Sequence, residues 1–336
     1  MMDLFGNEIV EQTPISRDML VDALSDELRG ITADGLAGML TNKVEAIIDF
    51  ARLCNGESAG QKISLLFNSH RLATATNKSK SLVEAMQDRG FCSGLARALV
   101  WKSGKVKELL YQCIQLGING IQYVNEFPPH IARDVYATYS ARRILDPCAG
   151  WGGRMIGAAA VGAFYHGFEP STKTHAGLMQ LGSFLKSFGT GFDYNVECLP
   201  FEDAELTDEY DVALTSPPYY DTEHYSDEPT QARIRYSNYA SFESAFLLPM
   251  VEKASSAAKN GLVLNIGSRQ YPMRSSIGNR YRIEVLSAFG LSGSHGLGKE
   301  KEDGEVFLRI ANPSVLLPHA PCGKEQRVVG SRDGDK

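Results

Sequence analysis

The sequence lacks the features of a membrane protein and of a disulfide-based or metal-based site. It contains no apolar run near the roughly 20 residues that a membrane-spanning helix needs, and no basic stretch followed by an apolar one at its N-terminus. Its six cysteines are scattered, with no Cys-x-x-Cys pair, which favours a reduced compartment and no zinc site. We therefore expect a cytoplasmic protein without a metal and without a membrane partner.

Positive charge is scarce overall but concentrated in one stretch. The 336-residue chain has a formal net charge of −6. Residues 1–60 contain 4 Lys and Arg against 11 Asp and Glu, whereas residues 61–110 contain 9 against 3. Such a local excess is what phosphate binding requires. Arg71, Lys78 and Lys80 are candidates for nucleic-acid contacts there, although a solvated loop between two helices explains the pattern equally well.

Two short motifs, each at the end of an apolar run, carry the functional signal. The first is Ile-Leu-Asp-Pro-Cys-Ala-Gly-Trp-Gly-Gly-Arg at 144–154, and the second is Thr-Ser-Pro-Pro-Tyr-Tyr at 215–220. The first predicts a strand, a glycine-rich turn and a helix, where the backbone can pass close to a nucleotide-like ligand. The second predicts a strand ended by two prolines, which cannot continue in a sheet. Both motifs therefore belong at the carboxyl edge of a sheet, where open α/β folds bind ligands.

In this order, the two motifs resemble those of the S-adenosylmethionine-dependent DNA amino-methyltransferases, which methylate an exocyclic nitrogen of adenine or cytosine. Those enzymes carry an Asp-Pro-x-x-Gly-x-Gly-like cofactor loop, matched by Asp146–Gly152, and a Ser/Asp/Asn-Pro-Pro-Tyr/Phe catalytic loop, matched by Ser216–Tyr219. The resemblance covers roughly residues 126–312. It implies S-adenosylmethionine as the cofactor and double-stranded DNA as the substrate.

The resemblance also implies a cofactor site assembled from several loops. Asp146 would lie near the amino-acid moiety, with the backbone of Gly150–Gly153 beneath the methionine and ribose. Glu169 fits the acidic residue about 20 positions on that accepts from ribose hydroxyls, and Asp203 would bind the adenine amino group. The full set of cofactor candidates is Phe127, Pro128, Asp146, Pro147, Ala149, Gly150, Gly152, Glu169, Pro170, Phe201, Glu202, Asp203 and Ser216.

The catalytic candidates are Ser216, Pro217, Pro218 and Tyr219. Methyl transfer to an amine needs the nitrogen placed in line with the methyl group. The Ser216 hydroxyl and the Pro217 carbonyl would accept the amine's hydrogens, and Tyr219 would stack on a base swung out of the duplex. Ser in place of Asp or Asn resembles the cytosine-N4 enzymes, and a hydroxyl both donates and accepts. We favour cytosine N4; adenine-N6, RNA or protein-amide methylation, and a catalytically silent DNA-binding module, are the alternatives.

Sequence recognition has no obvious place between the two motifs. Only 62 residues separate Gly153 from Ser216, and sheet and helices use them up. The N-terminal helical block or a partner subunit would then read the DNA, unless the enzyme has little specificity. The stretch 221–238 alternates aromatic and charged residues and adds Arg233, Arg235 and Tyr236 as DNA-contact candidates.

Alternating strand and helix patterns after residue 126 predict an α/β fold. We expect a doubly wound, mostly parallel, seven-stranded Rossmann-like methyltransferase sheet with an N-terminal helical subdomain, whose first helix is capped by Thr13 or Ser16. The predicted division is a helical region at 1–125 as candidate DNA-binding region, a catalytic domain at 126–312, and a disordered tail at 313–336. The expected strands are 144–145, 164–168, 194–198, 212–215, 261–266, 283–286 and 306–310.

Overall fold

A seven-stranded sheet with the strand order β3-β2-β1-β4-β5-β7-β6 forms the centre of the molecule. The computed structural model describes residues 15–75, 80–101, 107, 124, 126–220, 225–267, 271–286 and 305–313. Strands β1 to β5 pair in parallel, and β7 runs antiparallel to both β5 and β6. This confirms the predicted doubly wound, mostly parallel sheet. The strands are β1 Arg143–Asp146, β2 Phe164–Phe168, β3 Asp193–Glu197, β4 Val212–Thr215, β5 Leu262–Gly267, β6 Ile283–Val285 and β7 Glu305–Ile310.

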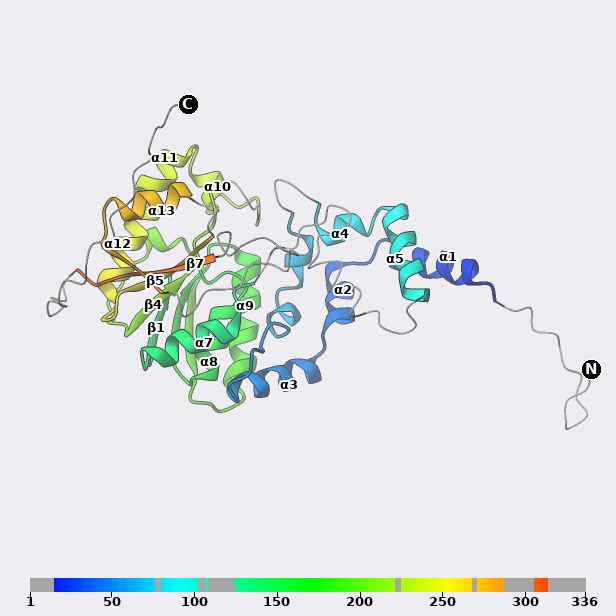
Figure 1. The fold of residues 1–336 in the computed structure, drawn as a ribbon, viewed down its shortest axis with the longest axis horizontal. Coiled ribbons are helices and arrows are strands. Elements are labelled where there is room, and N and C mark those ends of the chain that lie inside the picture. The colour runs from blue at the N-terminus through cyan, green and yellow to red at the C-terminus, as the bar shows by residue number, and fades with distance from the viewer. Residues whose placement is uncertain are drawn as a thin grey trace, which may run out of the picture.

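Helices cover both faces of this sheet (Figure 1). One face packs against α3, α7, α8 and α9 around the buried side chains of Ile144 and Tyr165. The other packs against the helical run α11–η5–α12, whose η5 is a π-helical turn, and against α13. These elements are α3 Lys43–Cys54, α7 Pro129–Thr138, α8 Gly153–Ala160, α9 Thr172–Lys186, α10 Ala232–Arg235, α11 Tyr239–Phe242, η5 Glu243–Leu247, α12 Leu248–Ala257 and α13 Tyr271–Gly278.

The N-terminal region contributes to two separate cores. Its helices α1, α2, α4 and α5 enclose an apolar cluster of their own, which includes Leu36 and Leu95. Helix α3 instead buries Phe50 and Leu53 against the sheet domain. Ser16 caps α1 by accepting from the Met19 N–H, as predicted. The elements are α1 Arg17–Leu28, α2 Ala33–Leu40, η1 Ser64–Leu66, η2 Ser69–Ala73, α4 Leu82–Ala85 and α5 Arg89–Trp101. The proposed division at residue 125 stays a prediction.

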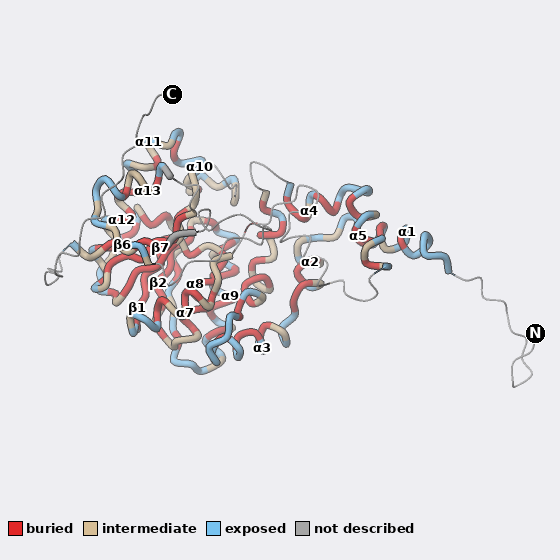
Figure 2. The backbone as a smooth tube through the Cα atoms, in the orientation of Figure 1, coloured by how far each residue is buried: buried red, intermediate tan, exposed pale blue. Residues whose placement is uncertain are grey.

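Buried residues run through the sheet and the inner faces of its helices, as Figure 2 shows. The strand order reverses at β1, which has β2 on one side and β4 on the other. Loops that follow such neighbouring strands leave in opposite directions and open a crevice at the carboxyl ends. Both sequence motifs follow strands at this point. Among the helices of the described segments, none is long and apolar enough to cross a membrane.

Candidate active site at the carboxyl ends of the strands

The loop after β1 is held by a buried ion pair. Asp146 is fully buried, and its carboxylate accepts from Arg154 Nε at 2.7 Å, from the Tyr165 hydroxyl at 2.6 Å and from the Cys148 N–H at 3.2 Å. Burial alone would lower the pKa of Arg154, but the adjacent Asp146 carboxylate raises it above its ordinary value. Asp146 therefore fixes the shape of this loop. Its contact with a cofactor stays a prediction.

The same carboxylate ties the two sequence motifs together. The hydroxyl of Thr215, the last residue of β4, donates to Asp146 Oδ1 at 3.0 Å. Thr215 is fully buried, and Ser216 follows it directly. The first residue of the catalytic loop thus starts beside the end of β1. Sequence reasoning named both motifs but missed the roles of Thr215, Tyr165 and Arg154.

The glycines of the loop serve two different purposes. Gly152 has a left-handed φ of 100°, and a Cβ there would lie 2.5 Å from a Leu181 methyl group. A Cβ on Gly153 would lie 2.0 Å from the Phe127 carbonyl oxygen. Gly150 has a φ of 57°, and a Cβ there would have its nearest neighbour, the Cys148 carbonyl oxygen, at 3.8 Å. Gly152 and Gly153 therefore permit close protein packing, and Gly150 leaves open backbone that a ligand can approach.

Four other cofactor candidates lie around this loop. Phe127 has its ring 5.1 Å from the Arg154 guanidinium carbon, and Pro128 is the N-cap residue of α7. Pro147 and Ala149 are buried. Pro147 and Ala149 belong to the loop after β1, and Phe127 and Pro128 lie beside it. Their contacts in the structure are packing contacts, and their role in cofactor binding stays a prediction.

Glu169 directly follows β2 and is only 8% exposed. Its carboxylate accepts from the Gly150 N–H at 3.0 Å and from the Ser171 N–H at 2.9 Å. Burial raises the pKa of Glu169 to about 7, although both backbone hydrogen bonds oppose the rise. The carbonyl of the following Pro170 accepts from Thr230 at 3.0 Å. The predicted ribose-binding carboxylate therefore lies directly beside the open Gly150 backbone.

The predicted adenine-binding segment contacts the predicted DNA-contact residues. Asp203, in η4 (Phe201–Asp203), forms a two-bond ion pair with Arg235 at 2.5 and 2.6 Å. This hydrogen bonding with Arg235 lowers the pKa of Asp203. Tyr236 donates its hydroxyl to Glu202 and is only 6% exposed. The Tyr236 side chain is thus buried against η4 in the free protein, and its contact with DNA stays a prediction.

Glu202 retains one uncommitted oxygen. Its side chain is 9% exposed, and Oε2 is buried without a hydrogen-bond partner within the described residues. Lys253 holds the backbone beneath by donating to the carbonyls of Phe201, Glu202 and Ala204. Among the adjacent carboxylates, Glu202 rather than Asp203 has an oxygen without a protein partner.

The catalytic loop has a fixed aromatic side chain. Pro217 is buried, while Ser216 and Pro218 are partly exposed. The Tyr219 hydroxyl accepts from the N–H of Gly267, the last residue of β5, at 2.7 Å. A Cβ on Gly267 would lie 3.0 Å from that hydroxyl, so glycine suits this position. The loop after β4 is thereby fastened to the end of β5.

The remaining DNA-contact candidates differ in exposure. Arg71 is 3% exposed and pairs with Glu126 at 2.7 Å in the free protein, and its contact with DNA stays a prediction. Lys80 and Arg233 are exposed. Lys78 lies outside the described residues, as does nearly all of the predicted tail at 313–336.

An N-terminal segment around η2 packs directly on the glycine-rich loop, which sequence reasoning did not foresee. Asn68 donates to the Trp151 carbonyl at 3.1 Å. The ring of Trp151 lies edge-on between His70 at 5.2 Å and Tyr225 at 5.7 Å. His70 also contacts the Thr174 hydroxyl at 3.0 Å, and burial lowers its pKa to about 4. His70 is therefore neutral near pH 7, and its role here is packing.

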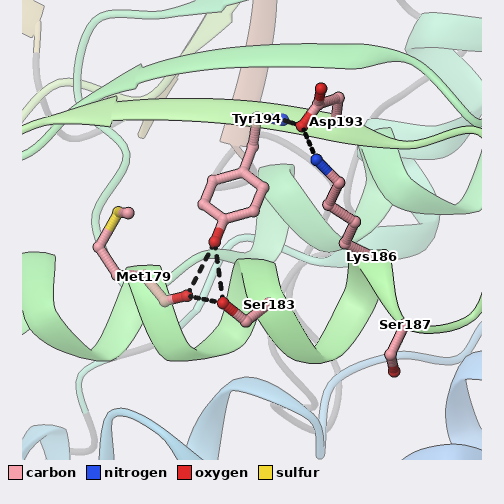
Figure 3. A pocket seen from close by; sticks show the side chains of 6 residues that line it. All are labelled: Met179, Ser183, Lys186, Ser187, Asp193 and Tyr194. Carbon is pink, nitrogen blue, oxygen red and sulfur yellow. Dashed lines mark hydrogen bonds and ion pairs between the residues drawn. The ribbon is translucent and has the colours of Figure 1, made fainter.

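A surface pocket of about 510 Å³ lies elsewhere, between α9 and β3 (Figure 3). Lys186 pairs with Asp193 at 2.7 Å, and the Tyr194 hydroxyl donates to the Met179 carbonyl at 3.1 Å. Because Asp193 begins β3, this pocket is not at the carboxyl ends of the strands. Within the described segments, no group of three or more His, Cys, Asp or Glu could hold a metal ion.

Comparison with solved structures finds several methyltransferases at low similarity. Magnesium protoporphyrin IX methyltransferase from Synechocystis PCC 6803 is 15% identical, with a TM-score of 0.35 over 54% of this chain and 77% of that one. An rRNA methylase from Streptococcus thermophilus is 14% identical, with a TM-score of 0.35 over 56% and 99%. A human methyltransferase 10 domain containing protein is 10% identical, with a TM-score of 0.38 over 56% and 85%.

Sequence comparison gives a different and more local relationship. No protein-family model matches this chain. A segment of 91 residues is 30% identical to the secreted effector PIT2 of Mycosarcoma maydis, and the match covers 25% of this chain and 71% of that protein. Over that quarter of its length, the chain belongs to the family of this effector.

Proposed function

We propose that the chain is an S-adenosylmethionine-dependent DNA amino-methyltransferase, with cytosine N4 as its favoured target. The observation that carries this proposal is the 3.0 Å hydrogen bond between Thr215 and Asp146. It brings the Asp-Pro-x-x-Gly-x-Gly-like loop and the Ser-Pro-Pro-Tyr loop together at the crevice where the strand order reverses. A reaction between two bound molecules needs such adjoining sites.

The residues at the crevice fit S-adenosylmethionine. Gly150 offers open backbone, and Glu169 beside it offers a carboxylate for ribose hydroxyls. The buried Oε2 of Glu202 would accept from the adenine amino group more readily than Asp203, whose two oxygens are held by Arg235. When bound, this cofactor supplies a methyl group already activated by its sulfonium.

The catalytic loop then has to position and activate a poor nucleophile. The lone pair of an exocyclic amine is delocalised into the ring of the base. The Ser216 hydroxyl and the Pro217 carbonyl would accept the amine's hydrogens and return electron density to the nitrogen. Tyr219, held by Gly267, would stack on the extruded base. Two prolines and this one hydrogen bond limit the movement of the loop.

Contacts to the nucleic acid would come from outside the crevice. Lys80 and Arg233 are exposed, and so is Trp101, at 64%. The guanidinium of Arg17 lies 4.6 Å from the Trp101 ring, an arrangement suited to stacking and phosphate contacts. We propose that these side chains contribute to DNA binding, and that a partner subunit supplies any sequence recognition that they lack.

The test is to incubate the purified protein with S-adenosylmethionine and unmodified duplex DNA, and to identify the nucleosides by mass spectrometry. N4-methylcytosine is the expected product. N6-methyladenine would keep the enzyme class and overturn the choice of base. Methyl transfer to RNA but not to DNA would move the enzyme to another substrate class, and transfer to neither would contradict the proposal.

Variants of the catalytic loop separate chemistry from cofactor binding. Ser216→Ala and Tyr219→Ala should abolish methyl transfer while S-adenosylmethionine still raises the melting temperature. Ser187→Ala, at an exposed serine after α9, is the matched control and should remain active. Full activity in either loop variant would refute the mechanism.

A further inference from the structure

A buried asparagine lies next to the catalytic loop. Strands β4 and β5 are parallel, with Thr215 beside Leu264, so the next residues along the two strands are Ser216 and Asn265. Side chains two apart on a strand share a face, so Asn265 projects from the same side of β5 as a Cβ on Gly267 would. That Cβ would lie 3.0 Å from the Tyr219 hydroxyl. This face of β5 therefore looks toward the Ser-Pro-Pro-Tyr loop.

The side-chain nitrogen of Asn265 is buried without a hydrogen-bond partner among the described residues. The residue as a whole is 2% exposed. Other asparagines behave differently: Nδ2 of Asn260 donates to the Asp211 carbonyl at 2.9 Å, and Nδ2 of Asn68 donates to Trp151. Buried amide groups are nearly always hydrogen-bonded. An unpaired donor beside the catalytic loop therefore indicates an acceptor on a bound molecule.

We propose that Asn265 is a specificity-determining residue that donates to the ring nitrogen beside the exocyclic amine of the target base. This inference rests on the proposed function. Cytosine presents an amine next to the unprotonated N3, and adenine presents one next to N1. Uracil and thymine instead carry an N–H at N3, which would oppose the Asn265 donor. Ser216 and Pro217 would accept the hydrogens of the amine, while Asn265 would donate to the ring nitrogen next to that amine.

The test pairs an Asn265 variant with a substrate that lacks the ring nitrogen. Oligonucleotides carrying 3-deazacytosine keep the amine but replace N3 by C–H. For the wild type, kcat/KM should fall about tenfold or more on this substrate, the size expected for one lost hydrogen bond. Asn265→Leu should lower kcat/KM on cytosine to a similar degree and leave it unchanged on 3-deazacytosine. If adenine proves to be the target, 1-deazaadenine takes the place of 3-deazacytosine.

Two further measurements keep the test decisive. Because Leu has nearly the shape of Asn and needs no partner, Asn265→Leu should melt at the same temperature as the wild type or higher. Asn195→Leu, at an asparagine of β3 on the far side of the sheet, should leave the discrimination between the two bases unchanged.

Each contrary result is distinct. An equal fall on both bases, or a lower melting temperature, would assign Asn265 a structural role and overturn the inference. Loss of thermal stabilisation by S-adenosylmethionine would place the acceptor on the cofactor and overturn it as well. A wild type that methylates neither base would refute the proposed function, and this inference with it.

Discussion

Two sets of buried polar groups around the crevice differ in their hydrogen bonding. On the β1–β2 side, Asp146 accepts four hydrogen bonds from the protein, and Glu169 accepts two from backbone N–H groups. By contrast, two groups on other elements are buried without hydrogen-bond partners among the described residues: Nδ2 of Asn265 in β5 and Oε2 of Glu202 in η4. The carboxylates of Asp146 and Glu169 are therefore satisfied by the protein itself. Asn265 and Glu202 keep hydrogen-bonding capacity that a ligand could use.

The difference follows from what each group costs when it is buried. An unpaired buried charge is so unfavourable that Asp146 must bring its own counter-ion, Arg154, into the core. A single unpaired amide or one free carboxylate oxygen costs about 1–3 kcal/mol, which a protein can tolerate where a ligand will recover it. We infer that the carboxylates at the ends of β1 and β2 set the shape of the site and that Asn265 and Glu202 set what it binds.

Breaking the buried ion pair of Asp146 with Arg154 should have the largest effect. Arg154→Met leaves the Asp146 carboxylate buried without its counter-ion, so we expect the free energy of unfolding to fall by about 3–5 kcal/mol. Urea denaturation followed by circular dichroism measures this loss. The double variant Asp146→Asn/Arg154→Met should recover much of it, because no charge then remains unpaired. Lys186→Met, which breaks an exposed pair with Asp193, should change little. Equal losses at both sites would contradict this comparison.

The sheet could be predicted from the sequence because its signals are local. Apolar runs bounded by Gly or Pro predicted strands at 164–168 and 212–215, and the structure has β2 and β4 with these same bounds. Ion pairs between distant residues leave no such signal. Arg71 looked like a surface cation because Glu126, its partner, lies 55 positions away, and Arg235 meets Asp203 across 32 positions.

Other site residues could have been found from the motif itself. Arg154 belongs to the first motif, eight positions after Asp146, and a charged residue inside an apolar Ala/Gly-rich helix indicates a buried partner. Asn265 gave a weaker signal as a lone amide in an apolar strand. Its position beside Ser216 becomes visible only once the register of β4 and β5 is known.

Glu169 should make stability depend on pH. Its pKa is about 7 in the folded protein against an ordinary value of 4.5, so between these pH values the folded state holds a proton that the unfolded state has lost. The contribution of Glu169 to the free energy of unfolding is therefore largest below pH 4.5. It is lost as the pH rises toward 7, by about 3 kcal/mol in total. Urea denaturation at pH 5 and pH 8 should show most of this fall.

Glu169→Gln isolates that contribution. The variant cannot ionise, so the difference in stability between pH 5 and pH 8 should shrink by about 2.5 kcal/mol relative to the wild type. Glu205→Gln, at an exposed glutamate after η4, should keep the wild-type profile. An unchanged profile in Glu169→Gln would mean that another group titrates in this range, and the carboxylate beside Gly150 would then be ionised throughout.

The smallest effect tests the hydrogen bond that joins the catalytic loop to the end of β5. Tyr219→Phe keeps the aromatic ring but leaves the Gly267 N–H without its acceptor. We expect the ordered conformation of the loop to lose about 1 kcal/mol of free energy. Methyl transfer should then be roughly fivefold slower. Thermal stabilisation by S-adenosylmethionine should be unchanged. Tyr220→Phe, which removes a hydrogen bond to the Tyr236 carbonyl, is the matched control and should slow the reaction less. If Tyr219→Phe were as inactive as Tyr219→Ala, the hydroxyl itself would take part in the chemistry, and the fastening of the catalytic loop to β5 would be a secondary matter.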